Sequence, residues 1–373
     1  MQSLSPLQTD FSHKAQKRVA QHSAEREIHK KARPLLCWGA EPSENHSDWM
    51  IEVVRADGDK TCPALSFYVH KCVLAAGSQY FAQLFRHGNR FTEGKTQSSR
   101  IELCEIGASA FLAFLDYLYS GNLEEESPTM TFTATPLQYL ARYFECPQLQ
   151  SDIRRFWTRD LGTQNCWIYY EHSKIFDDKE IMDAVINLCI EKPSEIPTVS
   201  SLFEITDTKF WLEILEKSSK EIVVRYHLSL LIAIYLFTEE KKGTTKREDF
   251  FRLTDEKYLP EVDYRAAMFF LRVEETFMSD RSAGLSSLQE RCVRALVANW
   301  TRMSYFDQTN IGILLKQDTV LLVRLLSLTV SQAKESHSEL LLKDNMNEKI
   351  ISHLYPLVKK HIQNEEFIAT FHS

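Results

Sequence analysis

Three residues near position 70 have side chains of the kinds that bind metals or move protons. Cys62, His70 and Cys72 lie within one short stretch, and thiolate and imidazole are preferred ligands of zinc. In an extended strand His70 and Cys72 point to the same side, but two ligands do not make a zinc site. We therefore expect a structural, hydrogen-bonded His70, no metal site and no cofactor.

The sequence carries none of the short motifs that mark common catalytic sites. Nucleophile-elbow, P-loop, dinucleotide-binding, zinc-protease and kinase signatures are all missing from it. Carboxylates are plentiful, but no pair of them stands in a recognisable acid–base arrangement. We assign no catalytic residue and expect no enzyme activity of the chain's own.

Composition limits the class of protein. The chain has 373 residues, of which 44% are hydrophobic and 25% charged, which favours two packed domains. Only 11 Gly and 11 Pro are present, too few for an all-β sandwich or barrel rich in turns. The net charge of −7 makes nucleic acid an unlikely partner, because phosphate backbones select basic surfaces.

Eight cysteines are scattered without a C-x-x-C pair, and no long apolar run opens the chain. This pattern predicts reduced, mostly buried thiols and a cytoplasmic or nuclear location, or both. The longest apolar stretch, Leu228 to Phe237, is about half the length of a membrane span. We therefore expect no membrane contact.

The first part of the chain predicts a polar tail followed by a β-hairpin. Residues 1–46 are polar with scattered charge. Residues 49–54 are rich in strand formers, Asp57-Gly58 favours a turn, and residues 65–69 alternate as a returning strand. A further short strand is predicted at 100–103.

Helical spacing begins after His70 and predicts several short helices. Ser78 is expected to cap the second of them. Ser109 is expected to cap an apolar helix that Gly121 ends, Pro136 to stand in the first turn of the next, and Pro147 to open the one after it. From residue 163 onward the whole pattern is helical, with a polar interruption at 239–249.

Four motifs in the correct order resemble the BTB/POZ domain. They are Asp48-Trp49-Met50-Ile51-Glu52-Val53, the run from Phe67 to Phe81 that contains His70-Lys71-Cys72-Val73-Leu74-Ala75-Ala76, the strand Ile101-Glu102-Leu103 with Leu115-Asp116-Tyr117-Leu118-Tyr119-Ser120-Gly121, and Leu137 to Phe144. More weakly, residues 165–217 are similar to the helical BACK region that follows many BTB domains.

The resemblance implies an α+β BTB/POZ domain followed by an all-α, BACK-like helical domain. We expect a flexible tail at 1–46, the BTB/POZ domain at 47–162, a BACK-like region at 163–238 and a helical C-terminal region at 239–373.

Cullin-binding members of this family carry a hydrophobic-x-Glu motif after the second core helix, and Phe91-Thr92-Glu93 stands in that loop. The resemblance therefore implies that Phe91 and Glu93 contact a cullin, with an exposed aromatic anchor and a carboxylate that sets the register. The other interpretation is a plain solvated loop.

In self-associating members, an acidic residue of the first strand and a basic residue after the His form a charged pocket at the dimer interface. Asp48 and Lys71 occupy these positions, so a homodimer through the BTB domain is one expectation and a local structural pair is the other. Pro34 and Pro42 interrupt the place where dimeric members have an exchanged helix.

The function that the resemblance implies is a protein-interaction adaptor. We expect a substrate-recognition subunit of a cullin-RING E3 ubiquitin ligase, whose partners are a cullin and an unknown protein substrate. The alternative is an oligomeric scaffold or transcriptional regulator that works through the BTB domain.

Overall fold

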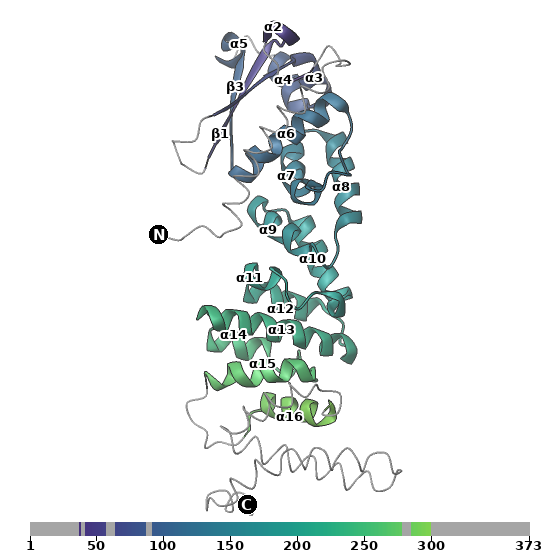
Figure 1. Cartoon of the computed structure of the whole chain (residues 1–373), viewed down its shortest axis with the longest axis vertical. Coiled ribbons are helices and arrows are strands. Elements are labelled where there is room, and N and C mark those ends of the chain that lie inside the picture. The colour runs from purple at the N-terminus through teal and green to yellow at the C-terminus, as the bar shows by residue number, and fades with distance from the viewer. Residues whose placement is uncertain (1–36, 39–41, 57–63, 87–91, 278–284, 300–373) are drawn as a thin grey trace, which may run out of the picture. The chain divides into compact units, whose positions relative to one another are not determined.

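The computed structural model describes residues 37–38, 42–56, 64–86, 92–277 and 285–299 (Figure 1). The chain forms two compact units. The first extends to Leu161 and includes Ile168–Ile181, and the second comprises Gly162–Trp167 and the residues from Met182 onward. The boundaries that we placed at 46/47, 162/163 and 238/239 stay a prediction.

A three-stranded sheet forms one side of the first unit. Its strands are β1 (Trp49–Arg55), β2 (Leu65–Val69) and β3 (Ser98–Leu103), in the order β2-β1-β3. The β1–β2 pair is antiparallel, as the predicted hairpin requires, and β3 lies parallel to β1. The predicted turn at Asp57-Gly58 lies outside the described residues.

The alternating sequence of β1 buries one face of the sheet. Trp49, Ile51 and Val53 are buried, and the residues between them are half-buried, as a strand with a period of two requires. The Trp49 Nε1–H also donates a hydrogen bond of 3.1 Å to Ser99 Oγ on β3.

The connection from β2 to β3 is helical, through α3 (Lys71–Gly77), α4 (Gln79–Arg86) and α5 (Thr92–Thr96). Ser78 caps α4 as predicted, because the Phe81 N–H donates to Ser78 Oγ at 3.2 Å. The same hydroxyl donates to the Phe144 carbonyl at 2.6 Å. One side chain therefore caps a helix and joins two distant parts of the chain.

The apolar helix α6 (Glu105–Ser120) starts earlier than its sequence predicted. Ser109 as cap is wrong: Cys104 holds that position, and its Sγ accepts from the Gly107 N–H at 3.4 Å. Ser109 lies inside the helix, where its hydroxyl bonds back to the Ile106 carbonyl. Gly121 ends the helix in the left-handed conformation with φ 70°, as predicted.

The next helix, α7 (Met130–Tyr143), also starts earlier, so the placement of Pro136 in a first turn is wrong. Pro136 stands inside the helix, where its ring removes one backbone hydrogen bond. Packing outweighs this loss, because the residues from Ala134 to Gln138 are all buried. Pro147 opens α8 (Pro147–Asp160) as predicted.

Four phenylalanines from α4, α6 and the end of α7 form the centre of the first unit: Phe81, Phe111, Phe114 and Phe144, all fully buried. Phe144 lies among the others, with ring centroids 5.2 Å from Phe81 and 4.9 Å from Phe114. The sheet and α4, α6 and α7 are held around this cluster.

A charged contact attaches the segment 168–181 to α7. This segment contains most of α9 (Cys166–Phe176) and the first residues of α10 (Lys179–Glu191). The buried Asp178 carboxylate pairs with Arg142 at 2.9 Å and accepts from Gln138 Nε2 at 3.0 Å.

The second unit is helical in every described element, as its sequence predicted. It contains η2 (Pro193–Glu195), α11 (Leu202–Ile205), α12 (Thr208–Lys217), α13 (Ile222–Lys242), α14 (Arg247–Leu253), α15 (Tyr264–Glu275) and α16 (Ser287–Asn299). Trp211 is fully buried and stacks on Phe203 at 5.7 Å. The expectation of an α+β domain followed by helices is confirmed.

By length and composition alone, α13 could cross a membrane, although half of its most apolar window is buried within the protein. It packs against α15 and α11. Its buried Arg225 donates to the carbonyls of Ser218 and Ser219. These contacts are those of a core helix, so we retain our expectation of no membrane contact as a prediction.

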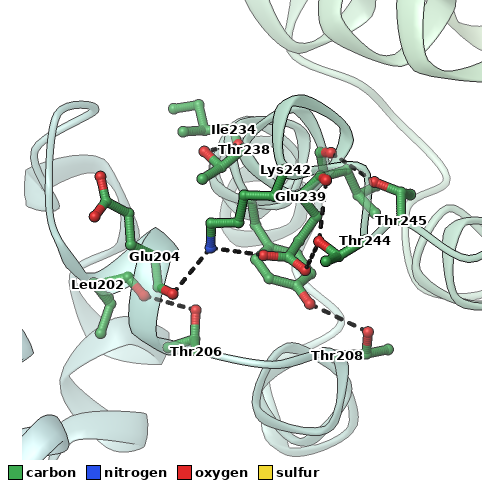
Figure 2. A network of polar contacts seen from close by, with 12 residues as sticks. Leu202, Glu204, Thr206, Thr208, Ile234, Thr238, Glu239, Lys242, Thr244 and Thr245 are labelled. Atoms are coloured by element: carbon green, nitrogen blue, oxygen red, sulfur yellow. Dashed lines mark hydrogen bonds and ion pairs between the residues drawn. The ribbon is translucent and has the colours of Figure 1, made fainter. Parts of the chain in front are cut away.

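The C-terminal end of α13 is tied to α11 (Figure 2). Lys242 Nζ donates to the Glu204 carbonyl at 3.0 Å and to Glu239 Oε1 at 2.9 Å. Thr244 Oγ1 donates to the other Glu239 oxygen at 2.7 Å. The polar stretch at 239–249, which we predicted to interrupt the helical pattern, therefore begins inside α13. Gly243 ends α13 in the left-handed conformation, with φ 69°.

Candidate protein-interaction surface

Glu93 lies in the first turn of α5 and is half-buried. Glu93 lies close enough to Tyr80 for its charge to affect the ionisation of the Tyr80 hydroxyl. Burial raises the pKa of Tyr80, and the neighbouring Tyr143 and Glu93 raise it further. Phe91, the other residue predicted to contact a cullin, lies outside the described residues. The structure thus places one half of the predicted motif beside an aromatic side chain of α4.

Tyr80 belongs to a row of aromatic rings across three helices of the first unit. Ring centroids lie 6.2 Å apart for Tyr80–Tyr143, 6.1 Å for Tyr139–Tyr143 and 4.8 Å for Tyr139–Phe176. Ile175 precedes Phe176 and is 49% exposed, and Tyr143 is 44% exposed. We call Tyr80, Tyr139, Tyr143, Ile175 and Phe176 the aromatic surface.

Sequence reasoning missed this surface, although part of its signal is local. Tyr139 and Tyr143 stand four residues apart, so they share one face of α7. That face lies beside the stripe of Leu137, Leu140 and Phe144 that fills the core. The local sequence could not predict that Ile175 and Phe176 belong to this surface, because only tertiary packing places α9 against α7.

Asp48 and Lys71 are in contact, and the contact uses the main-chain N–H of Lys71. The Lys71 N–H donates to Asp48 Oδ1 at 2.8 Å, so the carboxylate stands at the N-terminus of α3. Lys71 Nζ lies 4.9 Å from the centre of the Trp49 ring, within cation–π distance. Their role at an oligomer interface stays a prediction.

His70 is buried and fully hydrogen-bonded, as predicted. Its Nδ1 lies 2.8 Å from Tyr119 Oη, and its Nε2 lies 2.7 Å from the Asn45 carbonyl oxygen. The His70 N–H also donates to Tyr119 Oη at 2.8 Å. A carbonyl oxygen can only accept, so the ring donates to Asn45 from Nε2. Burial raises the pKa of Tyr119 to about 12, so its hydroxyl remains a donor.

Across the described ranges, no three His, Cys, Asp or Glu side chains are grouped to hold a metal ion. Of the three residues first considered for such chemistry, His70 serves the fold, Cys72 is exposed, and Cys62 lies outside those ranges.

The end of the predicted tail contacts the first unit. Trp38 is 9% exposed: its Nε1–H donates to Asp116 Oδ1 at 2.8 Å, and its ring meets Phe67 edge-on at 5.8 Å. Asn45 Nδ2 donates to the Cys37 carbonyl at 2.8 Å. Part of the segment 1–46 is therefore bound to the fold. A tryptophan within a polar segment was the sequence signal for this contact.

Comparison with known proteins agrees with this fold. The BTB/POZ domain family model matches residues 49–161. The chain is 31% identical over 112 residues to BTB/POZ domain-containing protein 6-B of Danio rerio, covering 30% of this chain and 21% of that protein. It is 31% identical over 135 residues to Kelch repeat and BTB domain-containing protein 8 of Danio rerio, covering 35% of this chain and 20% of that protein.

A longer match reaches BTB/POZ domain-containing protein 6 of Xenopus tropicalis, 26% identical over 165 residues, with 42% of this chain and 30% of that protein covered. The chain thus spans less than a third of the length of these relatives.

The family model does not extend to residues 163–238, so the BACK-like assignment stays a prediction. BTB domains are in general interaction modules and not enzymes. The sheet, its helical connections and the match over 49–161 identify this part of the chain as a BTB/POZ domain.

Proposed function

We propose that this protein is a substrate-recognition subunit of a cullin-RING E3 ubiquitin ligase and that the cullin docks on the aromatic surface and Glu93. The supporting observation is the row of partly exposed rings that runs from Tyr80 to Phe176 beside the Glu93 carboxylate.

The chemistry of the aromatic surface suits a protein partner. Tyrosines provide a large apolar area with a polar tip, and binding energy at protein interfaces is concentrated in such residues. Tyr143 and Ile175 are each close to half exposed, so a partner that covers them gains apolar burial that the free protein lacks.

Glu93 adds a charge at the edge of this surface. Its half-buried carboxylate stands in the first turn of α5, near Tyr80. A charge in this position favours a basic or hydrogen-bond-donating partner group and sets the register more than the affinity. Phe91 is proposed as the neighbouring apolar anchor.

The second unit is proposed to bind the protein substrate. Apart from the BTB fold, it is the largest packed part of the chain that the structure describes. Two neighbouring residues at the start of α13, Ile222 and Val223, are 55% and 66% exposed.

The test is a calorimetric titration of a purified cullin N-terminal domain against the full chain. We expect binding by the wild type, and a loss of at least about tenfold, or roughly 1.4 kcal/mol, for Phe91→Ala, Glu93→Ala and Tyr143→Ala separately. Phe91→Ala combined with Glu93→Ala should remove most of the affinity.

Glu126→Ala is the matched control. Glu126 is an exposed glutamate in the loop before α7, whereas Tyr143 is at the far end of that helix, about 20 Å away at the ordinary helical rise. This variant should bind like the wild type. No binding by the wild type would reject the cullin assignment, and equal binding by all variants would reject the proposed surface.

Self-association is the second candidate. Among the described strands, β2 and β3 each pair only with β1, and edge strands can pair with another chain. Sedimentation of the full chain at micromolar concentration separates the two candidates. A monomer that binds the cullin domain supports the first, and a dimer that Lys71→Glu dissociates supports the second, with Asp48 and Lys71 at its interface.

A further inference from the structure

An exposed threonine lies in the short connection between α13 and α14. Thr244 directly follows Gly243, whose left-handed conformation ends α13. Thr244 is exposed, whereas the next residue, Thr245, is half-buried. Of these two neighbouring hydroxyl groups, that of Thr244 is therefore the one that a second protein can reach.

The residues on both sides of Thr244 are basic. Lys241 and Lys242 precede it by three and two positions, and Lys246 and Arg247 follow it. All four of these residues are exposed, and the stretch 241–247 contains no carboxylate, although the whole chain has a net charge of −7. Basophilic protein kinases select an acceptor hydroxyl by pairing their own acidic side chains with basic residues two and three positions before it.

The Thr244 hydroxyl is part of the contacts that hold the end of α13. Its Oγ1 donates to Glu239 Oε2 at 2.7 Å and approaches the Glu239 carbonyl oxygen at 3.1 Å. The other Glu239 carboxylate oxygen accepts from Lys242 Nζ, which also donates to the Glu204 carbonyl on α11. Figure 2 shows that these groups form one series of contacts from the exposed connection to α11.

We propose that Thr244 is a phosphorylation site for a basophilic protein kinase that uses MgATP as the phosphoryl donor. The Thr244 Oγ1 attacks the γ-phosphorus of ATP, the bond between that phosphorus and the bridging oxygen breaks, and ADP leaves. The hydroxyl proton passes to the catalytic carboxylate of the kinase. This chain supplies the acceptor hydroxyl and the basic residues that recruit the kinase, independently of any cullin contact.

Phosphorylation converts a hydrogen-bond donor into a group with a charge of about −1.5 to −2 at pH 7. Thr244 then no longer donates to Glu239, and the phosphate and the carboxylate repel each other. The phosphate also lies beyond the C-terminus of α13, where the helix dipole disfavours negative charge. Because Lys242 already contacts Glu239, it is the cation that the phosphate draws away from the Glu204 carbonyl. Phosphorylation therefore loosens the tie between α13 and α11.

The primary test treats the wild-type full chain with the catalytic subunit of cAMP-dependent protein kinase and MgATP, and maps the phosphate by mass spectrometry. We expect phosphate on Thr244 and none on Thr245. Lys241→Ala combined with Lys242→Ala should slow the modification of Thr244 by at least about tenfold. Lys257→Ala, which changes an exposed lysine of the same unit, should leave the rate unchanged. An unmodified Thr244, or an undiminished rate in the double lysine variant, would overturn the proposal.

The structural effect is tested by hydrogen exchange with mass spectrometry. In the phosphorylated protein, the amides of residues 202–206 should exchange about fivefold faster, the effect of losing one hydrogen bond. Phosphatase treatment should restore the original rate. Thr244→Val removes the hydroxyl without adding charge and leaves Lys242 on the Glu204 carbonyl, so the same amides should change less. Exchange at 202–206 that phosphorylation does not alter would overturn the regulatory role given to Thr244.

Discussion

The Asp178 carboxylate and the Arg142 guanidinium form an ion pair of 2.9 Å, with the Asp178 side chain only 3% exposed. Arg142 is on α7, and Asp178 stands just before α10, where the Ile181 N–H also approaches its Oδ1 at 3.4 Å. Gln138 donates to the same carboxylate. One buried acid thus joins the segment 168–181 to α7, beside the aromatic surface.

Asp178→Ala is expected to lower the free energy of unfolding by about 3 kcal/mol, because it leaves the buried Gln138 amide without its acceptor and Arg142 with only its contact to Glu180 at 3.5 Å. Denaturant titration of the full chain measures the loss. The control is Asp183→Ala: Asp183 is 58% exposed and paired with Lys217 at 3.1 Å. A surface pair of this kind contributes less than about 1 kcal/mol. Equal losses for the two variants would contradict the role given to Asp178.

His172 is expected to make stability depend on pH. It is buried on α9, its Nδ1 has no hydrogen-bond partner among the described residues, and burial lowers its pKa to about 4. An unfolded histidine has a pKa of about 6.5. Between these values the unfolded chain binds the proton more strongly. Stability is therefore complete above about pH 6.5 and falls as the pH decreases toward 4.

Unfolding titrations from pH 7 to pH 4 measure this dependence. The contribution of His172 amounts to roughly 3 kcal/mol over the full window. His172→Phe should flatten the curve in that window, because the replacement has no titrating group. His227→Phe serves as the control, since His227 is only half-buried on α13. A curve for His172→Phe that keeps the wild-type slope would contradict the prediction.

Tyr119→Phe is expected to destabilise the first unit by about 1–3 kcal/mol, the usual cost of leaving buried polar groups unpaired. The Tyr119 hydroxyl contacts both the main-chain N–H and Nδ1 of His70. Thermal unfolding of the full chain checks this. Tyr143→Phe removes a hydroxyl from a tyrosine that is far more exposed and should leave stability close to that of the wild type.

Trp38 is expected to contribute to stability although it lies in a segment of tail-like sequence. Trp38→Ala should cost about 3 kcal/mol, within the range for removing a large buried side chain. Trp38→Phe keeps an aromatic ring against Phe67 but loses the hydrogen bond to Asp116, so it should cost less. Chemical denaturation of both variants gives the comparison. Wild-type stability of Trp38→Ala would show that the segment does not support the fold.

The sequence by itself determined the local elements whose signals lie within a few residues. The strand-forming residues of β1, the Ser78 cap and Pro147 at the start of α8 all act through backbone and side-chain chemistry that needs no distant partner. The BTB motifs were visible for the same reason. Ser109 and Pro136 were misplaced because long-range packing extended both helices by a turn or more.

Only the tertiary structure decided which residues meet. The aromatic surface joins α4, α7 and α9. Such contacts depend on how helices pack, and packing is set by the shape of the whole core. The polar sequence before Asp48 predicted a flexible tail, yet Trp38 packs against Phe67 and donates a hydrogen bond to Asp116. Both partners lie far along the chain, and no local pattern connects them to Trp38.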